Sequence, residues 1–155
     1  MWKNCLIAFL ISMVPLAEIR VGIPVALATG VHPVLAYAIC IFGNMLPVPV
    51  IFFFARKVLE WGKDKKFIGK FFTFCLEKGH KGGQKLLAGK NGAYIALMLF
   101  VGIPLPGTGA WTGTLAASIL DLDFKKSTLS VVCGVILAGI IMGVLSMFGI
   151  NLLKG

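Results

Sequence analysis

The decapeptide PLAEIRVGIP, Pro15 to Pro24, places Glu18 and Arg20 inside an otherwise apolar region. The residues before it, CLIAFLISMV, and those after it, VALATGV, are apolar or small. Proline and glycine interrupt helices, and charged side chains at membrane depth face a cavity or a partner rather than lipid. The stretch therefore predicts an irregular elbow within a membrane-embedded segment.

The composition of the whole chain is that of an integral membrane protein. Its 155 residues are 58% hydrophobic, and the mean hydropathy is +0.94. Pro33 to Phe54 is a run of 22 residues without a charge, and Ser127 to Ile150 is a run of 24. As helices these runs are about 33 Å and about 36 Å long, enough for a hydrocarbon core of roughly 30 Å. We expect a single all-α membrane domain over residues 1–155.

The basic residues are concentrated in one connecting segment. The net charge is +9, and ten of the fifteen Lys and Arg residues lie between Arg56 and Lys90. This is the positive-inside pattern of a cytoplasmic loop, so we expect a multi-pass protein of the inner membrane with residues 56–92 in the cytoplasm. The same pattern explains the charge without nucleic-acid binding. The cysteines lack metal-ligand spacing and predict free thiols, and neither a metal nor a cofactor is expected: Cys5, Cys40, Cys75 and Cys133.

A second interruption, GIPLPGTGAWTG from Gly102 to Gly113, divides the apolar region Tyr94 to Leu120. Each interrupted region is followed by a full-length apolar run. A shift of 91 residues aligns the two halves with six identities, which pair Leu6 with Leu97, Phe9 with Phe100, Pro15 with Pro106, Gly22 with Gly113, Ala26 with Ala117 and Gly43 with Gly134. We interpret the chain as two repeats. The first repeat is 1–54, with a hairpin at 4–31 and a span at 33–54; the second is 93–155, with a hairpin at 93–121 and a span at 127–150.

Two topologies are open for the interrupted regions. As kinked helices they cross the membrane and make the halves parallel; as re-entrant hairpins they return from the midplane and make the halves inverted. Both place twelve basic residues inside and two outside, so charge does not decide. The density of proline and glycine favours hairpins, and non-helical backbone at this depth must be buried in protein, which predicts that the tips face each other. The predicted tip residues are Pro15, Gly22, Pro24, Pro104, Pro106, Gly107, Gly109 and Gly113.

The basic segment 55–92 carries an amphipathic pattern. At 100° per residue one face gathers Phe67, Ile68, Phe71, Phe72 and Cys75, and the opposite face gathers Lys66, Lys70 and Glu77. This pattern predicts a helix that lies in the membrane interface. It either senses anionic lipids or simply holds the loop at the headgroups.

Glu18 and Arg20 are the candidates for chemistry. Glu18 is a candidate proton or cation acceptor, because acids at midplane depth often belong to an ion or substrate pathway. Arg20 is a candidate anchor for an anionic group. The alternative for both is an ion pair within the tip, and Arg20 also suits the capping of carbonyls freed at the break.

Further candidate binding residues come from the second tip and from the first span. Thr108 and Thr112 offer hydroxyls, and Trp111 offers a ring that stacks on a flat substrate or merely packs. Asn44 is polar inside a span: it either joins the cavity or satisfies backbone groups freed by nearby prolines. We therefore predict substrate contacts from Arg20, Asn44, Thr108, Trp111 and Thr112.

The segments PLAEIRVGIPVALATG and FVGIPLPGTGAWTGTLAA resemble the two signature segments of the small multidrug export family. Chain length and the central basic loop agree with that family. More distantly, the chain is similar to DedA-like membrane proteins, a resemblance that implies paired re-entrant hairpins, inverted repeats, and acidic and arginine residues that serve proton-coupled transport or lipid movement. This chain departs from the DedA-like pattern, because Glu18 and Arg20 both lie in the first tip and the second tip has no charged residue.

The leading functional hypothesis is a small membrane transporter that exports a small organic or amphipathic solute, with proton coupling at Glu18. The alternatives are a lipid flippase or scramblase and a non-transporting scaffold or assembly factor. No nucleophile and base are paired in the sequence, so an enzyme is not expected. Gly139 and Gly143 form a GxxxG pattern that permits close helix packing, within the chain or with a second copy. Because the interior is small, we expect a homodimer in the bilayer.

Overall fold

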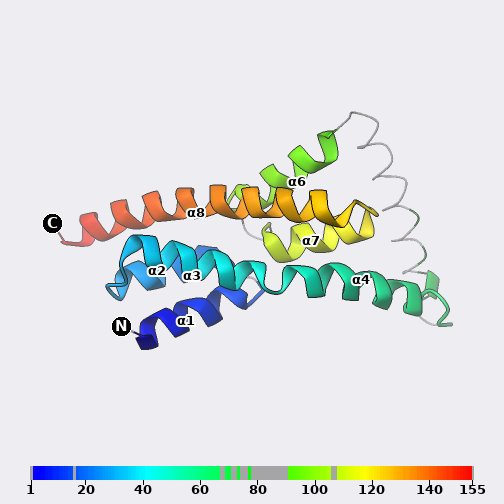
Figure 1. Ribbon diagram of the computed structural model, residues 1–155, viewed down its shortest axis with the longest axis horizontal. Coiled ribbons are helices and arrows are strands. Elements are labelled where there is room, and N and C mark those ends of the chain that lie inside the picture. The colour runs from blue at the N-terminus through cyan, green and yellow to red at the C-terminus, as the bar shows by residue number, and fades with distance from the viewer. Residues whose placement is uncertain are drawn as a thin grey trace.

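The computed structural model describes residues 2–15, 17–66, 69, 70, 73, 77, 91–105 and 108–154. Within these ranges the chain forms helices and no strand. Figure 1 shows the helices lying along one long axis. They are α1 (Trp2–Met13), α2 (Glu18–Ala28), α3 (Pro33–Met45), α4 (Val48–Gly62), α6 (Gly92–Gly102), α7 (Ala110–Ile119) and α8 (Phe124–Lys154). The predicted interfacial helix falls mostly on residues outside these ranges.

Two helical paths are long and apolar enough to cross a membrane by length and composition. One is Pro33–Gly62, with a mean hydropathy of 2.1, and the other is Phe124–Leu152, with a mean hydropathy of 2.6. The two paths run in opposite directions along the long axis (Figure 1). The predicted all-α fold is confirmed for the described residues, and two helical paths have the length and apolar composition of membrane spans.

The first path is not one continuous helix. α3 ends at Met45 and α4 begins at Val48, so the predicted span 33–54 is divided at residues 46–47. Proline has no backbone N–H, and therefore Pro47 and Pro49 cannot donate to the carbonyls of Gly43 and Met45 as a continuous helix requires. We call residues 46–47 the break.

The remaining helices form two side-by-side pairs. α1 packs against α2 and α3, whereas α6 packs against α7 and α8. The chain reverses between the members of each pair. We call the described residues between α1 and α2, which are 14, 15 and 17, the first turn, and the described residues between α6 and α7, which are 103–105, 108 and 109, the second turn. The first turn, the second turn and the break lie at about the same level along the long axis (Figure 1).

Glycines let each long path approach the first helix of a pair. A Cβ at Gly43 of α3 would lie 2.8 Å from the Phe9 carbonyl oxygen of α1, and a Cβ at Gly134 of α8 would lie 2.7 Å from the Met98 carbonyl oxygen of α6. Side chains at these positions would force the helices apart. Gly43 and Gly134 are equivalent under the shift of 91 residues.

Three predicted tip residues lie inside helices instead. Gly22 and Pro24 belong to α2, and Gly113 belongs to α7. Gly22 is buried against Ser12, and Gly113 is buried against Val101, so these glycines serve helix packing within a pair. The sequence prediction placed them in the irregular turns because glycine interrupts isolated helices, but close packing outweighs that preference here.

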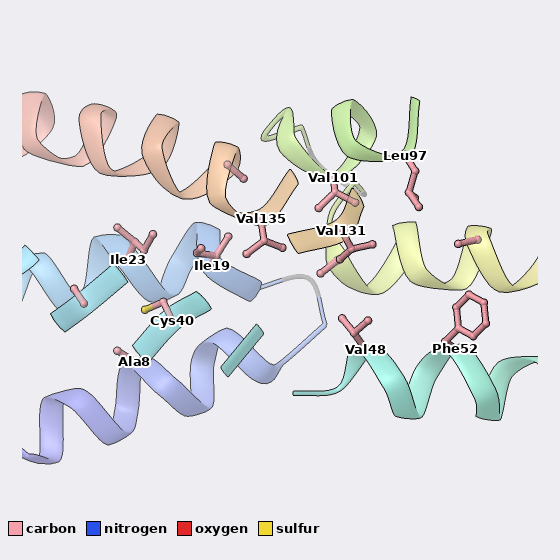
Figure 2. Close-up of a cluster of buried hydrophobic side chains, with 14 of the residues drawn as sticks. Ala8, Ile19, Ile23, Cys40, Val48, Phe52, Leu97, Val101, Val131 and Val135 are labelled. Atoms are coloured by element: carbon pink, nitrogen blue, oxygen red, sulfur yellow. The ribbon is translucent and has the colours of Figure 1, made fainter. Parts of the chain in front are cut away.

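The GxxxG pattern of α8 is used within the chain. Gly139 faces Ile19 and Ile23 of α2, and Gly143 faces the Tyr37 ring of α3. These contacts bring α8 against α2 and α3 and close the apolar core, in which Ile19, Ile23, Val131 and Val135 are buried (Figure 2).

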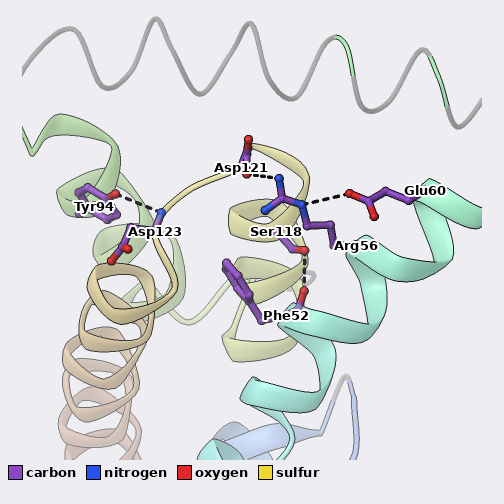
Figure 3. A network of polar contacts seen from close by, with 7 residues as sticks. All are labelled: Phe52, Arg56, Glu60, Tyr94, Ser118, Asp121 and Asp123. Atoms are coloured by element: carbon purple, nitrogen blue, oxygen red, sulfur yellow. Dashed lines mark hydrogen bonds and ion pairs between the residues drawn. The ribbon is translucent and has the colours of Figure 1, made fainter.

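A polar network fixes α7 relative to α4 near the start of α8 (Figure 3). The Ser118 hydroxyl donates to the Phe52 carbonyl at 2.7 Å. Arg56 of α4 forms ion pairs with Asp121 and with Glu60. These bonds set the register of α4 and α7, which run in the same direction (Figure 1).

Candidate functional site

The Glu18 carboxylate caps the N-terminus of α7. Its oxygens accept the backbone N–H of Ala110 at 3.2 Å and that of Trp111 at 3.0 Å. The first N–H groups of a helix have no partner within it, and the positive end of the helix dipole favours an anion. Gly109, the residue before α7, has no side chain with which to cap it. A carboxylate from the other helix pair therefore does so, and Glu18 is only 4% exposed.

Backbone conformation makes room for this carboxylate. Glu18 has φ 48°, a left-handed conformation that is uncommon for residues other than glycine. Gly109 has φ 152°, and a Cβ there would overlap the Glu18 carboxylate. Strained backbone of this kind persists only where surrounding contacts hold it, and it gathers at functional sites.

Arg20 holds the second turn. Its Nη2 donates to the Thr108 hydroxyl oxygen at 2.6 Å and to the Ile103 carbonyl at 3.4 Å. The Thr108 hydroxyl lies 2.8 Å from the Ile103 carbonyl and 2.9 Å from that of Leu105, and can donate to either. These bonds satisfy carbonyls at the C-terminal end of α6. Among the described residues no ion pair joins Glu18 to Arg20, so the alternative of an ion pair between these two residues of α2 is wrong for this structure.

Trp111 makes the reciprocal bond. Its indole N–H donates to the Met13 carbonyl, the last residue of α1, at 3.1 Å. We call the hydrogen bonds that Glu18, Arg20 and Trp111 make across the two turns, to the opposite turn or to the helix end beside it, the cross-turn bonds. Each of them joins the first helix pair to the second.

The other predicted site residues have different surroundings. Asn44 is completely buried near the break, and its amide has no hydrogen-bond partner among the described residues. Thr112 is exposed, and its hydroxyl lies 3.4 Å from the Gly109 carbonyl of its own turn. Pro15 is exposed, Pro104 is half-buried, and Pro106 and Gly107 lie outside the described residues.

Sequence reasoning missed the backbone partners. The N–H of Ala110 and the carbonyls of Met13 and Ile103 carry no side-chain signal. The shift of 91 residues held a clue, because it aligns Glu18 with Gly109 and Arg20 with Trp111. Thr114 follows the second interruption and also offers a hydroxyl, which is buried without a partner in the described part of the chain.

Trp111 also borders an apolar groove between α4 and α7. The groove has a volume of about 330 Å³ and is lined by Ile51, Phe54, Ala55, Val58, Trp111, Leu115 and Ile119. Trp111 thus connects this groove to the cross-turn bonds.

Comparison with known proteins gives one match. The family described as "Putative small multi-drug export protein" matches residues 18–141, a range that includes Glu18, Arg20, Thr108 and Trp111. No curated protein and no solved structure matched the chain. Because the match covers most of its length, the chain belongs to the small multi-drug export protein family.

Proposed function

We propose that this protein is a small inner-membrane transporter in which two re-entrant hairpins meet at the membrane midplane. Helix length supports this: α1 has 12 residues and α2 has 11, so each is about 17 Å long and reaches halfway through a core of roughly 30 Å. The hairpins are the pairs α1–α2 and α6–α7, and the spans are α3–α4 and α8. Residues 56–92 then lie in the cytoplasm.

Equivalent contacts in the two halves support an inverted repeat. Gly43 and Gly134 are aligned by the shift of 91 residues, and each packs closely against a backbone carbonyl of the first helix of a hairpin. Glu18 and Gly109, also aligned, meet each other directly. When equivalent residues of two repeats touch, they lie near the pseudo-twofold axis that relates the repeats. Because the two spans run in opposite directions, this axis lies in the membrane plane. One repeat supplies the acid and the other supplies the glycine that accommodates it.

The observation that carries the transport proposal is the Glu18 carboxylate on the N-terminus of α7. Protonation of Glu18 removes the negative charge that attracts the Ala110 and Trp111 N–H groups and the α7 dipole. Arg20, the charged neighbour on α2, remains bound to the second turn. Proton uptake therefore weakens the two hydrogen bonds of Glu18 and lets the start of α7 move away from α2, while Arg20 still holds the second turn. This movement opens a path for a small organic or amphipathic solute. Proton release restores the closed arrangement.

Reconstitution into liposomes tests this function. We expect purified protein to move an amphipathic fluorescent dye in response to a pH gradient, and Glu18→Gln to abolish the dependence on the gradient. Glu60→Gln is the matched control, because Glu60 is a half-exposed acid paired with Arg56. Undiminished, pH-dependent dye movement by Glu18→Gln would remove Glu18 from the mechanism.

The groove beside Trp111 favours one other function, the movement of lipids. Its lining is entirely apolar, and it opens on the outside of the helix bundle between α4 and α7. An acyl chain fits such a surface. A flippase or scramblase would transfer fluorescent phospholipid between leaflets, with a rate lowered by Trp111→Ala and unchanged by Trp61→Ala, which alters an exposed tryptophan. Dye transport without lipid transfer would decide against it.

A further inference from the structure

Two buried polar side chains near the break have no hydrogen-bond partner in the part of the chain that the structure describes. Asn44 is 0% exposed, and neither its amide nitrogen nor its amide oxygen is hydrogen-bonded within the described residues. Thr114 of α7 is 1% exposed, and its hydroxyl is likewise unpaired there. Buried polar groups in native proteins are nearly always paired, so two such groups call for a ligand.

The helix register places both side chains at the level of the turns. α2 and α3 run in opposite directions, and a Cβ at Gly22 would lie 3.2 Å from the Cys40 sulfur. One helical turn closer to the break, α2 reaches Glu18 and α3 reaches Asn44.

The bond between Ser118 and Phe52 fixes the position of Thr114 in the same way. α7 and α4 run in the same direction (Figure 1). One turn back along each helix lie Thr114 and Val48, the first residue after the break. Asn44 and Thr114 therefore approach the break from its two sides.

The C-terminal end of α3 is electronegative, and its cap residue, Leu46, donates its backbone N–H to the Phe42 carbonyl only. α1, α3 and α6 all end at this level, and the dipole of each puts a partial negative charge there. The Met13 carbonyl at the end of α1 accepts a hydrogen bond from the Trp111 indole N–H. The Ile103 carbonyl, directly after α6, accepts one from Arg20. At the end of α3 the prolines leave the carbonyls of Gly43 and Met45 without their helical donors.

We propose that this break binds a monovalent alkali cation, Na⁺ or K⁺, through the Asn44 amide oxygen, the Thr114 hydroxyl and the freed carbonyls of Gly43 and Met45. Alkali cations take neutral oxygen ligands, and carbonyls at helix C-terminal ends are a recurrent way to hold them. A divalent ion requires carboxylates as well, and Glu18 is engaged with α7. The site goes beyond the proposed function, since it depends neither on proton coupling nor on the solute.

Thermal unfolding of the full chain in detergent tests the site. Melting temperature is compared in NaCl, KCl and N-methylglucamine chloride at equal ionic strength. A ligand that binds the folded state raises the melting temperature with its concentration. We expect a dose-dependent rise in Na⁺ or K⁺ over N-methylglucamine, lost in Asn44→Ala and kept in Asn151→Ala, which alters an exposed asparagine of α8.

Thr114→Val, which removes the hydroxyl at nearly constant volume, covers the case in which Asn44→Ala does not fold, and is expected to reduce the cation response. Equal melting temperatures in all three salts would mean that only water occupies the break and would overturn the proposal. A cation response that survives both substitutions would overturn it as well, because the ion would then bind elsewhere. Glu18→Gln does not enter this test, so its result stands apart from that of the transport assay.

Discussion

Glu18 and Gly109 show how closely single residues are matched at the centre of the molecule. The acid adopts a left-handed backbone, and its carboxylate occupies the space that any side chain at position 109 would need. Gly30 also has a positive φ, of 79°, but no atom lies within 4 Å of a Cβ built there. A side chain at position 30 would therefore meet backbone strain alone, whereas one at position 109 would meet backbone strain and overlap with Glu18.

Alanine at these glycines should destabilise to different extents. Gly30→Ala should lose about 1–2 kcal/mol from left-handed backbone strain alone. Gly109→Ala should lose a further 1–3 kcal/mol, roughly, because its methyl group overlaps the Glu18 carboxylate. Thermal unfolding in detergent measures both. Adding Glu18→Ala should recover part of the loss at position 109 and none at position 30, and strict additivity in the Gly109 cycle would contradict the contact.

At the scale of elements, the ends of α1 and α6 and the start of α7 are each bonded to a residue of the other helix pair. The two interruptions predict that helices stop near Pro15 and Pro104, and α1 and α6 end close to these residues, whereas the end of α3 before Pro47 divides a predicted single span. The partners of these helix ends were beyond sequence reasoning, because the Ala110 N–H and the Met13 carbonyl are backbone groups more than ninety residues from the side chains that bind them. Of the roles considered for Arg20, only the capping of freed carbonyls agrees with its bond to the Ile103 carbonyl, and that carbonyl belongs to the second interruption rather than the first.

Substitution of Thr108 tests the completion of α6. Thr108→Val removes both the acceptor for Arg20 and the donor to the Ile103 carbonyl, so the free energy of unfolding should fall by about 1–3 kcal/mol. Thr108→Ser keeps the hydroxyl and should restore most of this loss. Thr112→Val is the control, since its exposed hydroxyl makes only a 3.4 Å contact with its own turn. Equal effects of valine at positions 108 and 112 would show that the Arg20 bond contributes nothing.

On the scale of the whole molecule, the sequence predicted the two apolar paths and the interruption that precedes each of them. The length of the apolar runs and the positions of proline and glycine were enough to predict these features, because both are properties of residues close together in the sequence. The assignment of Gly22, Pro24 and Gly113 to the tips failed, because helix packing against Ser12 and Val101 depends on the assembled bundle. The charge pattern left two topologies equal, whereas in the structure α1 and α2 lie side by side.

Labelling of introduced cysteines decides between these topologies in the membrane. With the native cysteines replaced, single cysteines are placed at Lys3, Lys63 and Lys125, all exposed. If α1–α2 and α6–α7 are re-entrant hairpins, position 125 shares a side with position 63, and position 3 lies opposite; in Figure 1 the N-terminus lies at the end of the long axis away from the α4 end. A membrane-impermeant maleimide, applied to intact cells and to inverted vesicles, should therefore react with 63 and 125 from one side only and with 3 from the other. Because crossing helices exchange positions 3 and 125 while leaving 63 unchanged, labelling of 3 together with 63 would overturn the hairpins and, with them, the midplane position of Glu18.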